Sequence, residues 1–219
     1  TGIQQSHTGI EFELSAQLNE MFRLDAGVSM GNWVYTDDAT GTYRDGTEDK
    51  SYSYALKDLK VSIDIHIGGE KVALNAFAVE GFGNTELYLL EPKSEKHRDM
   101  TRRLYNGQGK CRIAQEMILG IGGVRLMREL NIPVELYHFN EGHALFAGFE
   151  LIREKMEAGL TFRQAFAATK SEVVFTTHTP VKAGNEIHQI SDLLEQGVGL
   201  EVMGEPELAE LGGNPFEMT

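Results

Sequence analysis

Two short polar clusters carry the residue types that could do chemistry in this sequence. The run ELYHFNEGHALFAG places His138, Glu141 and His143 within six positions, directly after a β-rich stretch. A second cluster, TTHTP, places His178 after the β-rich run EVVF. Histidine and glutamate side chains can bind a metal, transfer a proton or hydrogen-bond a polar ligand. The spacing within each cluster decides which of these is favoured.

A metal site is disfavoured by this spacing. Zinc-binding helices use His-Glu-x-x-His, which places both rings one turn apart on the same helix face. His138 and His143 are instead five positions apart and lie on either side of a predicted strand end. The single cysteine, Cys111, has no second cysteine with which to share a zinc ion. The sequence therefore predicts no metal ligands in these clusters.

Hydrogen bonding to a sugar suits these residue types better. Sugar hydroxyls both donate and accept, so sugar sites combine carboxylates, amides and neutral imidazoles near strand ends. Asn140 and Glu141 could bind such hydroxyls, and His143 and His178 would add polar groups. Taken alone, His143 is better explained by capping or packing at a helix start, and His178 by hydrogen bonding to loop backbone. The sugar hypothesis requires both clusters to face one hollow of hexose size.

The pattern from residue 61 onward predicts an α/β fold that could bring the clusters together. The expected elements are a hairpin around Gly68 and Gly69, a buried strand over residues 85–92, helices over residues 110–130, 144–159 and 161–170, and short strands over residues 134–139 and 172–180. Alternation of strands and helices predicts a parallel sheet with right-handed crossovers. Ligands bind at the carboxyl ends of such strands, so the loops 140–143 and 177–179 should share one space.

Two finer features are also expected in this α/β part. Thr161 and Gln164 have the spacing of a capping box at a helix start. Gly120, Gly122 and Gly123 interrupt the helix over residues 110–130, at a cost in helix propensity. Such glycines predict close packing of that helix against a neighbour.

Residues 1–60 have a different pattern. Strict alternation predicts one strand over residues 8–18 and another over residues 22–30, joined as a hairpin, with a long polar loop over residues 36–51. A soluble antiparallel sheet is the default explanation. Long strands with aromatic residues near their ends also suit a hairpin of an outer-membrane barrel, although a few strands cannot close a barrel.

The composition limits the partners of the chain. Its 219 residues, 41% of them hydrophobic, can bury a core. The formal net charge of -13 repels nucleic-acid backbones and anionic lipid surfaces, but does not affect neutral ligands such as sugars. No stretch approaches the roughly twenty apolar residues of a membrane-spanning helix. The single cysteine fits a reducing compartment and also a cysteine-poor exported protein. Of these two, we expect a cytoplasmic location.

Five segments between residues 61 and 219 resemble the α-glucan phosphorylases, the family of the glycogen, starch and maltodextrin phosphorylases. The segments, in family order, are LYLLEP, RLYNGQGKCRIAQEMILGIGGVRLMRELNI, YHFNEGHALFAGFELIREKMEAGLTFRQAF, VVFTTHTPVKAGNE and PFEMT. The resemblance implies an incomplete N-terminal lobe of a GT-B, Rossmann-like glycosyltransferase. Such an enzyme transfers a terminal α-1,4-linked glucose from a glucan or maltooligosaccharide to inorganic phosphate, with retention of configuration. The resemblance also implies pyridoxal 5'-phosphate as cofactor, bound by a lysine beyond Thr219, so the fragment alone is expected to be inactive.

The resemblance assigns roles to both clusters. The run NEGH matches a family loop at the acceptor and glucose subsites, which makes Asn140, Glu141 and His143 candidate substrate-binding residues. The run THTP matches the loop whose histidine contacts the transferred glucose. His178 thereby becomes the candidate catalytic residue, and Thr177 a candidate substrate-binding residue.

Other positions receive no active role from the resemblance. Arg112, Gln115 and Glu116 match a helix segment that is expected to be structural. After Pro180, the run VKAGNEIHQ replaces the P-A-G-H-D-x-F run of many family members, which indicates a divergent branch. This departure leaves three residues without an assigned role: Asn185, Glu186 and His188.

Residues 1–60 resemble a different family. The run QQSHTGIEFELSAQLNEMFRLDAGVSMGNWVY, followed by YALKDLKV, is similar to a late barrel segment of TonB-dependent outer-membrane receptors. The sequence thus predicts a chimera, with a receptor-like region over residues 1–60 and the phosphorylase-like region over residues 61–219. Two alternatives to an enzyme fragment stay open: a receptor fragment, with membrane contact confined to residues 1–60, and a glucan-binding module without catalysis.

Overall fold

The computed structural model describes residues 5–17, 23–35, 39–45, 48–80, 86–103, 109–178 and 186–218, with side chains from residue 56 onward except at residue 80. The chain divides into two compact units: the first comprises Thr1–Lys57 and Val79–Leu87, and the second comprises Asp58–Ala78 and Tyr88–Thr219. Among the described residues, every helix is too short or too polar to cross a bilayer. The division into domains at residue 60 stays a prediction.

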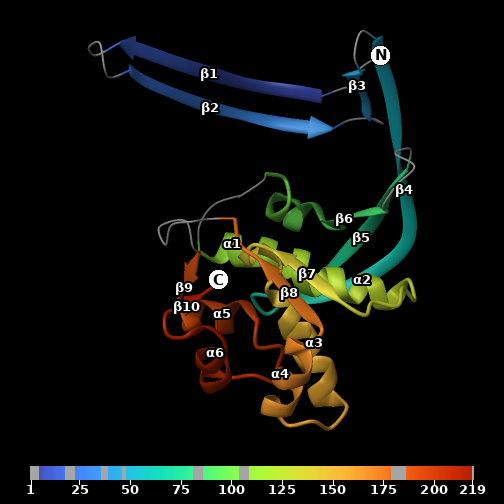
Figure 1. Cartoon of the computed structure of the whole chain (residues 1–219), viewed down its shortest axis with the longest axis vertical. Helices are drawn as coiled ribbons and strands as arrows, with labels where there is room; N and C mark the ends of the chain where they lie inside the picture. Colours follow the sequence, from blue (N-terminus) through green and yellow to red (C-terminus); the bar gives the residue numbers. More distant parts are fainter. Residues whose placement is uncertain are drawn as a thin grey trace. The chain divides into compact units, whose positions relative to one another are not determined.

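Two long antiparallel strands open the first unit. β1 (Gln5–Gln17) pairs with β2 (Arg23–Tyr35), with Gln5 opposite Tyr35 and Gln17 opposite Arg23 (Figure 1, blue). The predicted hairpin is confirmed, because strict alternation of residue types matches the two-residue period of a strand.

The predicted polar loop over residues 36–51 is wrong. β3 (Ala39–Asp45) pairs antiparallel with the first part of β4 (Glu48–Ile67), with Tyr43 opposite Lys50 and Arg44 opposite Asp49. Threonine and tyrosine favour extended backbone, and opposite charges at facing positions favour pairing. A polar composition therefore did not exclude strands in this segment.

The second unit begins with the predicted hairpin around Gly68 and Gly69. The last part of β4 and β5 (Glu70–Glu80) are joined there by two glycines with φ of +59° and +78°, as a two-residue turn with both central φ angles positive requires. β6 (Leu87–Pro92) is the terminal strand in the order β3-β4-β5-β6. Because Leu87 and Leu89 are exposed on this edge strand, the prediction that it is buried is wrong.

A long helical stretch follows a short 3-10 helix, η1 (Glu95–Met100). It runs through α1 (Lys110–Met117), the π-helical segment η2 (Ile118–Gly122) and α2 (Gly123–Glu129). Of the five residues that helical spacing predicts for its inner face, Ile113, Met117, Ile121 and Val124 are buried, whereas Met127 is half-buried. The wider π turn coincides with the glycine-rich part of the sequence.

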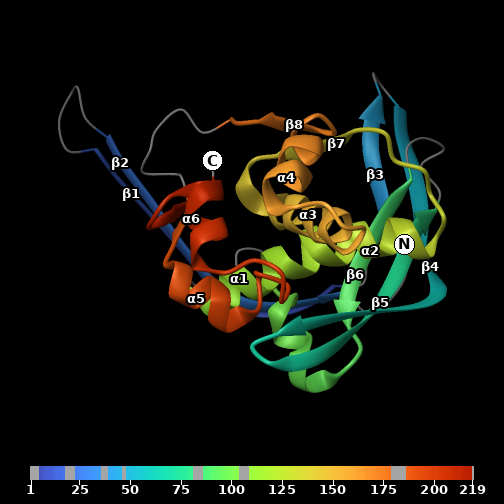
Figure 2. The ribbon, with the colours of Figure 1, turned by 90° about the horizontal axis from the view of Figure 1, so that it is seen from below.

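Two strands and two helices then form the parallel α/β layer that the sequence predicts. In chain order they are β7 (Tyr137–Asn140), the 3-10 turn η3 (Gly142–Ala144), α3 (Phe146–Glu157), α4 (Phe162–Lys170) and β8 (Val173–Thr176). β7 and β8 pair in parallel, which confirms the α/β prediction in its coarse form. The capping box of Thr161 and Gln164 is also confirmed. α3 lies between η2 and α4, in contact with both (Figure 2).

Four short C-terminal elements were not predicted. They are α5 (Ile190–Gln196), α6 (Glu205–Gly212) and an antiparallel pair of β9 (Ile187–His188) and β10 (Phe216–Glu217). Two-residue strands and helices of two turns show too few periods to be recognised in a sequence. Their residues Leu193, Leu208 and Phe216 are buried in the main hydrophobic core, which also includes the β4–β5 hairpin and the long helical stretch.

The predicted close packing is confirmed at Gly120 and Gly122 and is wrong at Gly123. A Cβ at Gly120 would lie 2.5 Å from the backbone nitrogen of Ala147, at the start of α3. A Cβ at Gly122 would meet two leucine side chains, whereas one at Gly123 meets none of the described atoms within 4 Å. Gly120 therefore allows η2 to approach the backbone of α3.

The Gly120→Ala substitution is expected to lower the free energy of unfolding by about 1–3 kcal/mol, because the new methyl group would force η2 and α3 apart. Gly123→Ala is the matched control, since the same change in open space should be neutral or stabilising by up to about 1 kcal/mol. Denaturant unfolding followed by circular dichroism measures both values. Equal effects of the two substitutions would contradict the close approach.

Candidate functional site

The two predicted polar clusters meet at the carboxyl ends of β7 and β8. The parallel register places Asn140 opposite Thr176, so the segments that begin at Glu141 and at Thr177 leave the sheet side by side. The backbone N–H of Glu141 donates to the Thr176 carbonyl at 2.8 Å. The predicted convergence of the two loops is therefore observed. The roles of their residues stay predictions.

Glu141 connects the two loops through its carboxylate. Its Oε2 accepts a hydrogen bond from the Thr177 hydroxyl at 3.3 Å, and its Oε1 accepts from the backbone N–H of His178. The residue has φ +62° and ψ -178°, a region that is almost confined to glycine. These contacts hold the strained backbone of Glu141 and fix the position of the loop that carries His178.

Two substitutions of Glu141 distinguish the effect of backbone strain on stability from the effect of the lost hydrogen bonds. Both Glu141→Ala and Glu141→Gly remove the carboxylate, but only glycine relieves the positive φ. We expect Glu141→Gly to be more stable than Glu141→Ala by about 1–2 kcal/mol, the reverse of the usual order for these residues. Denaturant midpoints of the two variants decide the order. A more stable alanine variant would show that this backbone geometry is not retained in solution.

His143 is turned toward the long helical stretch. Its Nδ1 lies 2.6 Å from Nη2 of Arg112 in α1. The same guanidinium donates from Nε to both carboxylate oxygens of Glu186, at 2.9 and 3.0 Å. Arg112 thereby joins three parts of the second unit: α1, the turn after β7 and the residue before β9.

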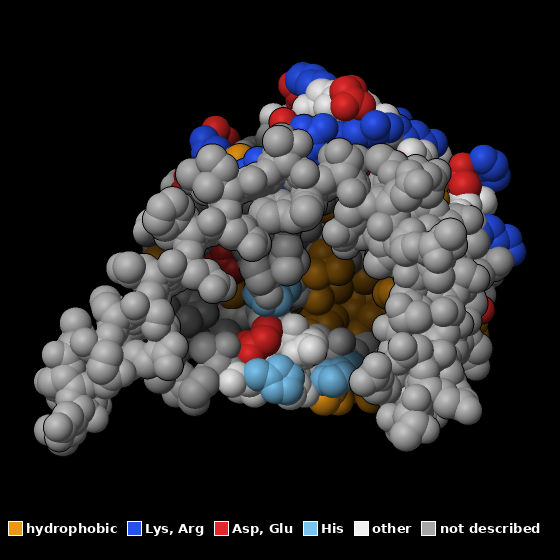
Figure 3. Space-filling model, turned by 90° about the horizontal axis from the view of Figure 1, so that it is seen from above, with side chains coloured by type: hydrophobic (Ala, Val, Ile, Leu, Met, Phe, Trp, Pro, Cys, Tyr) orange, Lys and Arg blue, Asp and Glu red, His pale blue; other side chains and the backbone are white. Residues whose placement is uncertain are grey.

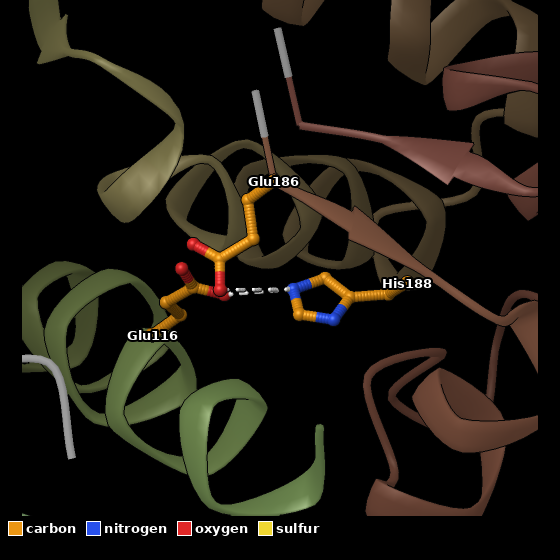
Figure 4. Close-up of side chains that lie close together, drawn as sticks. All are labelled: Glu116, Glu186 and His188. Atoms are coloured by element: carbon orange, nitrogen blue, oxygen red, sulfur yellow. Dashed lines mark hydrogen bonds and ion pairs between the residues drawn. The ribbon is translucent and has the colours of Figure 1, made fainter. Parts of the chain in front are cut away.

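Beside Arg112 lie two carboxylates and an imidazole, of which Glu116 and His188 are buried and Glu186 is half-buried. Figure 4 shows the side chains of Glu116, Glu186 and His188 converging from α1, from the residue before β9 and from β9 itself. His188 Nε2 lies 3.3 Å from Glu116 Oε2, and Arg112 Nη2 lies 3.1 Å from Glu116 Oε1. Burial raises the pKa of Glu116 to about 7, and the nearby Glu186 adds to this rise, while His188 and Arg112 oppose it.

Glu116, Glu186 and His188 could supply some of the ligands of a metal ion. One ligand atom each from Glu116, Glu186 and His188 lie within 4.8 Å of one another. However, the guanidinium of Arg112 is already ion-paired with both carboxylates and serves as their counter-cation. A metal ion would have to displace it, so the geometry favours an ion-pair network over a metal centre.

The remaining predicted residues lie at the surface of the same region. Asn140 and His178 are exposed, and Thr177 is exposed beside Glu141. His138 bonds through Nε2 to the Thr176 hydroxyl at 2.7 Å, so it supports the strand pair and does not join His143. On the face shown in Figure 3, histidine and acidic side chains lie beside apolar ones.

The hexose-sized hollow between the two loops stays a prediction. Residues 179–185, including Thr179 and Asn185, lie outside the described residues. Two pockets lined by described residues lie elsewhere: one of about 570 Å³ contains His66, Arg125 and Glu201, and one of about 130 Å³ contains Phe139 and Phe216.

Four residues of the site received no active role from the sequence: Arg112, Glu116, Glu186 and His188. The sequence does contain a signal that could have identified Arg112 and Glu116. Arg112 and Glu116 are spaced i and i+4, and they share the buried face of α1 with Ile113 and Met117. Charged residues on an apolar helix face must be paired, which points to a polar network. No comparable signal marks Glu186 and His188.

Comparison with known proteins supports part of the sequence analysis. The chain is 39% identical over 164 residues to the maltodextrin phosphorylase of Thermococcus litoralis, which covers 72% of this chain and 20% of that protein. It is 43% identical over 134 residues to a glycogen phosphorylase of Mycobacterium tuberculosis, covering 57% of this chain and 16% of that protein. The chain thus spans about a fifth of the length of these phosphorylases. No protein-family profile matches it.

A third relative bears on residues 1–60. An uncharacterized protein of Methanocaldococcus jannaschii is 34% identical over 222 residues, covering 96% of this chain and 40% of that protein. Because the alignment covers 96% of this chain, it includes most of residues 1–60. The predicted chimera with an outer-membrane receptor is therefore not supported, because one relative carries both regions.

Proposed function

We propose that this chain is part of an α-1,4-glucan phosphorylase of the GT-B type, and that the loops after β7 and β8 contribute to its glucan-binding surface. The proposed reaction transfers a terminal glucose to inorganic phosphate with retention of configuration. The observation that carries the proposal is the link from Glu141 to Thr177 and His178 across two parallel strands. Similarity to maltodextrin and glycogen phosphorylases supports it.

The proposed role of each residue follows from its position. His178 is exposed on the loop that Glu141 fixes, so its imidazole could face the transferred glucose. Asn140 is exposed at the end of β7 and could bind a sugar hydroxyl through its amide. Since the Glu141 carboxylate already accepts from Thr177 and His178, its proposed contribution to binding is mainly through the loop that it orders.

The residues of this site do not fit a pyridoxal 5'-phosphate cradle. That cofactor requires a lysine for its Schiff base. The described site residues include no lysine, and Lys110, at the start of α1, is paired with Glu195 at 2.5 Å. We therefore assign no step to the cofactor in this chain, and propose that its binding residues belong to another part of the parent protein.

Calorimetry with maltooligosaccharides tests the binding proposal on this chain. We expect weak binding by the unmodified protein and a loss of at least about fivefold in affinity for His178→Ala, because a removed hydrogen bond to a sugar costs about 1 kcal/mol. His66→Ala is the matched control, since His66 is exposed on β4 and belongs to neither loop. Equal affinity of all three proteins would overturn the role of His178.

Turnover is tested separately. With glucan, inorganic phosphate and added pyridoxal 5'-phosphate, this chain alone is expected to produce no glucose 1-phosphate. Formation of glucose 1-phosphate would contradict the assignment of the cofactor site to another part of the protein. Glucan binding by this chain and by its full-length parent, with turnover by neither, would favour a binding module without catalysis.

A further inference from the structure

The contact between Arg112 and His143 determines which ring nitrogen of the imidazole carries the proton. Nη2 of Arg112 and Nδ1 of His143 are 2.6 Å apart, within hydrogen-bond distance. A guanidinium has only N–H donors and accepts no hydrogen bond. A proton on Nδ1 would therefore face an N–H group at this distance. The contact requires Nδ1 to present its lone pair, which leaves the ring proton on Nε2.

Arg112 is held firmly enough to impose this choice. Its side chain is only 9% exposed. Nε is fixed by both oxygens of Glu186, and Nη2 lies 3.1 Å from Glu116, one helical turn further along α1. A guanidinium that contacts carboxyl groups in two different segments cannot rotate away from His143 without losing both contacts. His143 Nδ1 is also 4.0 Å from Glu116 Oε1, too far for a hydrogen bond to a carboxylate.

We propose that Arg112 is a positioning residue that fixes His143 as a single neutral tautomer, with Nδ1 as acceptor and Nε2–H as donor. The His143 side chain is 38% exposed, so a ligand can reach the ring. The chemistry that complements such a donor is a hydroxyl or ring oxygen of an uncharged sugar. Only this last step rests on the proposed function. The tautomer follows from the geometry alone.

The tautomer is measured directly by nitrogen NMR of the chain labelled with ¹⁵N-histidine, because the chemical shifts of Nδ1 and Nε2 differ strongly between the two tautomers. The signal of His143 is assigned by its loss in His143→Gln. We expect more than about nine-tenths of the Nε2–H form near neutral pH. A spectrum with Nδ1 protonated, in either the neutral or the cationic ring, would overturn the proposal without any further variant.

Arg112→Met tests whether Arg112 is the cause. We expect both tautomers to become populated, at least in the proportion of one to ten, because the fixed donor is gone. If this variant does not fold, the double variant Arg112→Met with Glu116→Gln replaces it, since it removes the buried cation and a buried anion together. An unchanged single tautomer in a folded variant would remove Arg112 from the positioning role.

Carbohydrate affinity separates this inference from the proposed function. We expect His143→Ala and the folded Arg112 variant to weaken maltooligosaccharide binding to a similar extent, by about threefold or more. If the tautomer depends on Arg112 but His143→Ala binds as well as the unmodified chain, the positioning role stands. The part of the proposed function that uses His143 would then fail.

Discussion

Glu150→Gln is expected to lower the free energy of unfolding by about 3–5 kcal/mol, the typical cost of removing one partner of a buried ion pair. Glu150 lies in α3 and its side chain is 0% exposed. Arg125 and Arg153 each donate two hydrogen bonds to its carboxylate, at distances between 2.6 and 3.0 Å. An amide can accept only part of these bonds and leaves both guanidinium groups without their shared anion.

The cost extends beyond α3, because Arg125 also binds β4. Its Nη1 donates to the Asp64 backbone carbonyl at 2.6 Å. The carboxylate therefore helps to attach the β4–β5 hairpin to the helices. Denaturant unfolding followed by circular dichroism measures the loss.

The matched control is the surface pair of Arg128 and Glu154. These side chains are 44% and 27% exposed and form an ion pair at 2.9 Å between α2 and α3. Exposed pairs contribute about 1 kcal/mol or less, so Glu154→Gln should have a small effect. A loss of similar size in both variants would mean that burial does not set the cost at Glu150.

The Glu150 pair also makes the protein more sensitive to acid. Burial raises the pKa of Glu150, but the hydrogen bonds from Arg125 and Arg153 outweigh it and leave the pKa below its ordinary value. A carboxyl group with a lowered folded-state pKa stabilises the protein above the ordinary pKa of 4.5, and this contribution is lost as the pH falls below it. Glu150→Gln should therefore cost less at pH 3 than at pH 7.

Periodicity in the sequence was sufficient for the longer elements of this fold. Alternation predicted the β1–β2 hairpin, paired glycines predicted the turn at Gly68 and Gly69, and helical spacing predicted the buried face of the helix that begins at Lys110. It was insufficient where pairing depends on facing residues from another strand, as in β3, or where an element spans few periods, as in β9 and β10. These elements depend on tertiary contacts that local patterns do not encode.

In the candidate site too, local patterns predicted some features, whereas others depend on tertiary contacts. The rule that ligands bind at carboxyl ends of parallel strands correctly brought Glu141 and His178 together. The sequence could not show that the Glu141 carboxylate would bind the neighbouring loop, or that Arg112 would reach His143. The network around Glu116 was missed because its partners Glu186 and His188 lie about seventy positions further along the chain. Glu186 lies directly before β9 and His188 lies within it, and β9 is held by its pairing with β10.

Glu116 should respond to pH in the opposite direction from Glu150, although both carboxyl groups are buried near arginine. Glu150 shares its charge with two guanidinium groups, whereas Glu116 and Glu186 compete for one, Arg112. Among the described residues, Glu116 Oε1 has no hydrogen-bond partner, and its side chain is 2% exposed. Glu116 is buried, and Arg112 compensates its negative charge only in part. The pKa of Glu116 is therefore raised to about 7.

The raised pKa predicts a loss of stability between about pH 5 and pH 8. A group whose folded-state pKa is raised stabilises the protein fully below its unfolded pKa, and this contribution disappears as the pH rises through the folded value. A shift from 4.5 to about 7 corresponds to roughly 3 kcal/mol. Glu116→Gln imitates the protonated form, so it should match the unmodified protein near pH 5 and exceed its stability by roughly this amount at pH 8.

Denaturant unfolding of both proteins at several pH values isolates this contribution, because other titrating groups cancel in the difference. Glu129→Gln, an exposed change in α2, provides the control and should follow the unmodified protein at every pH. A difference between Glu116→Gln and the unmodified protein that stays constant with pH would show that Glu116 is ionised throughout. Arg112 would then compensate both carboxylates, and each glutamate of the ion-pair network would carry a full charge.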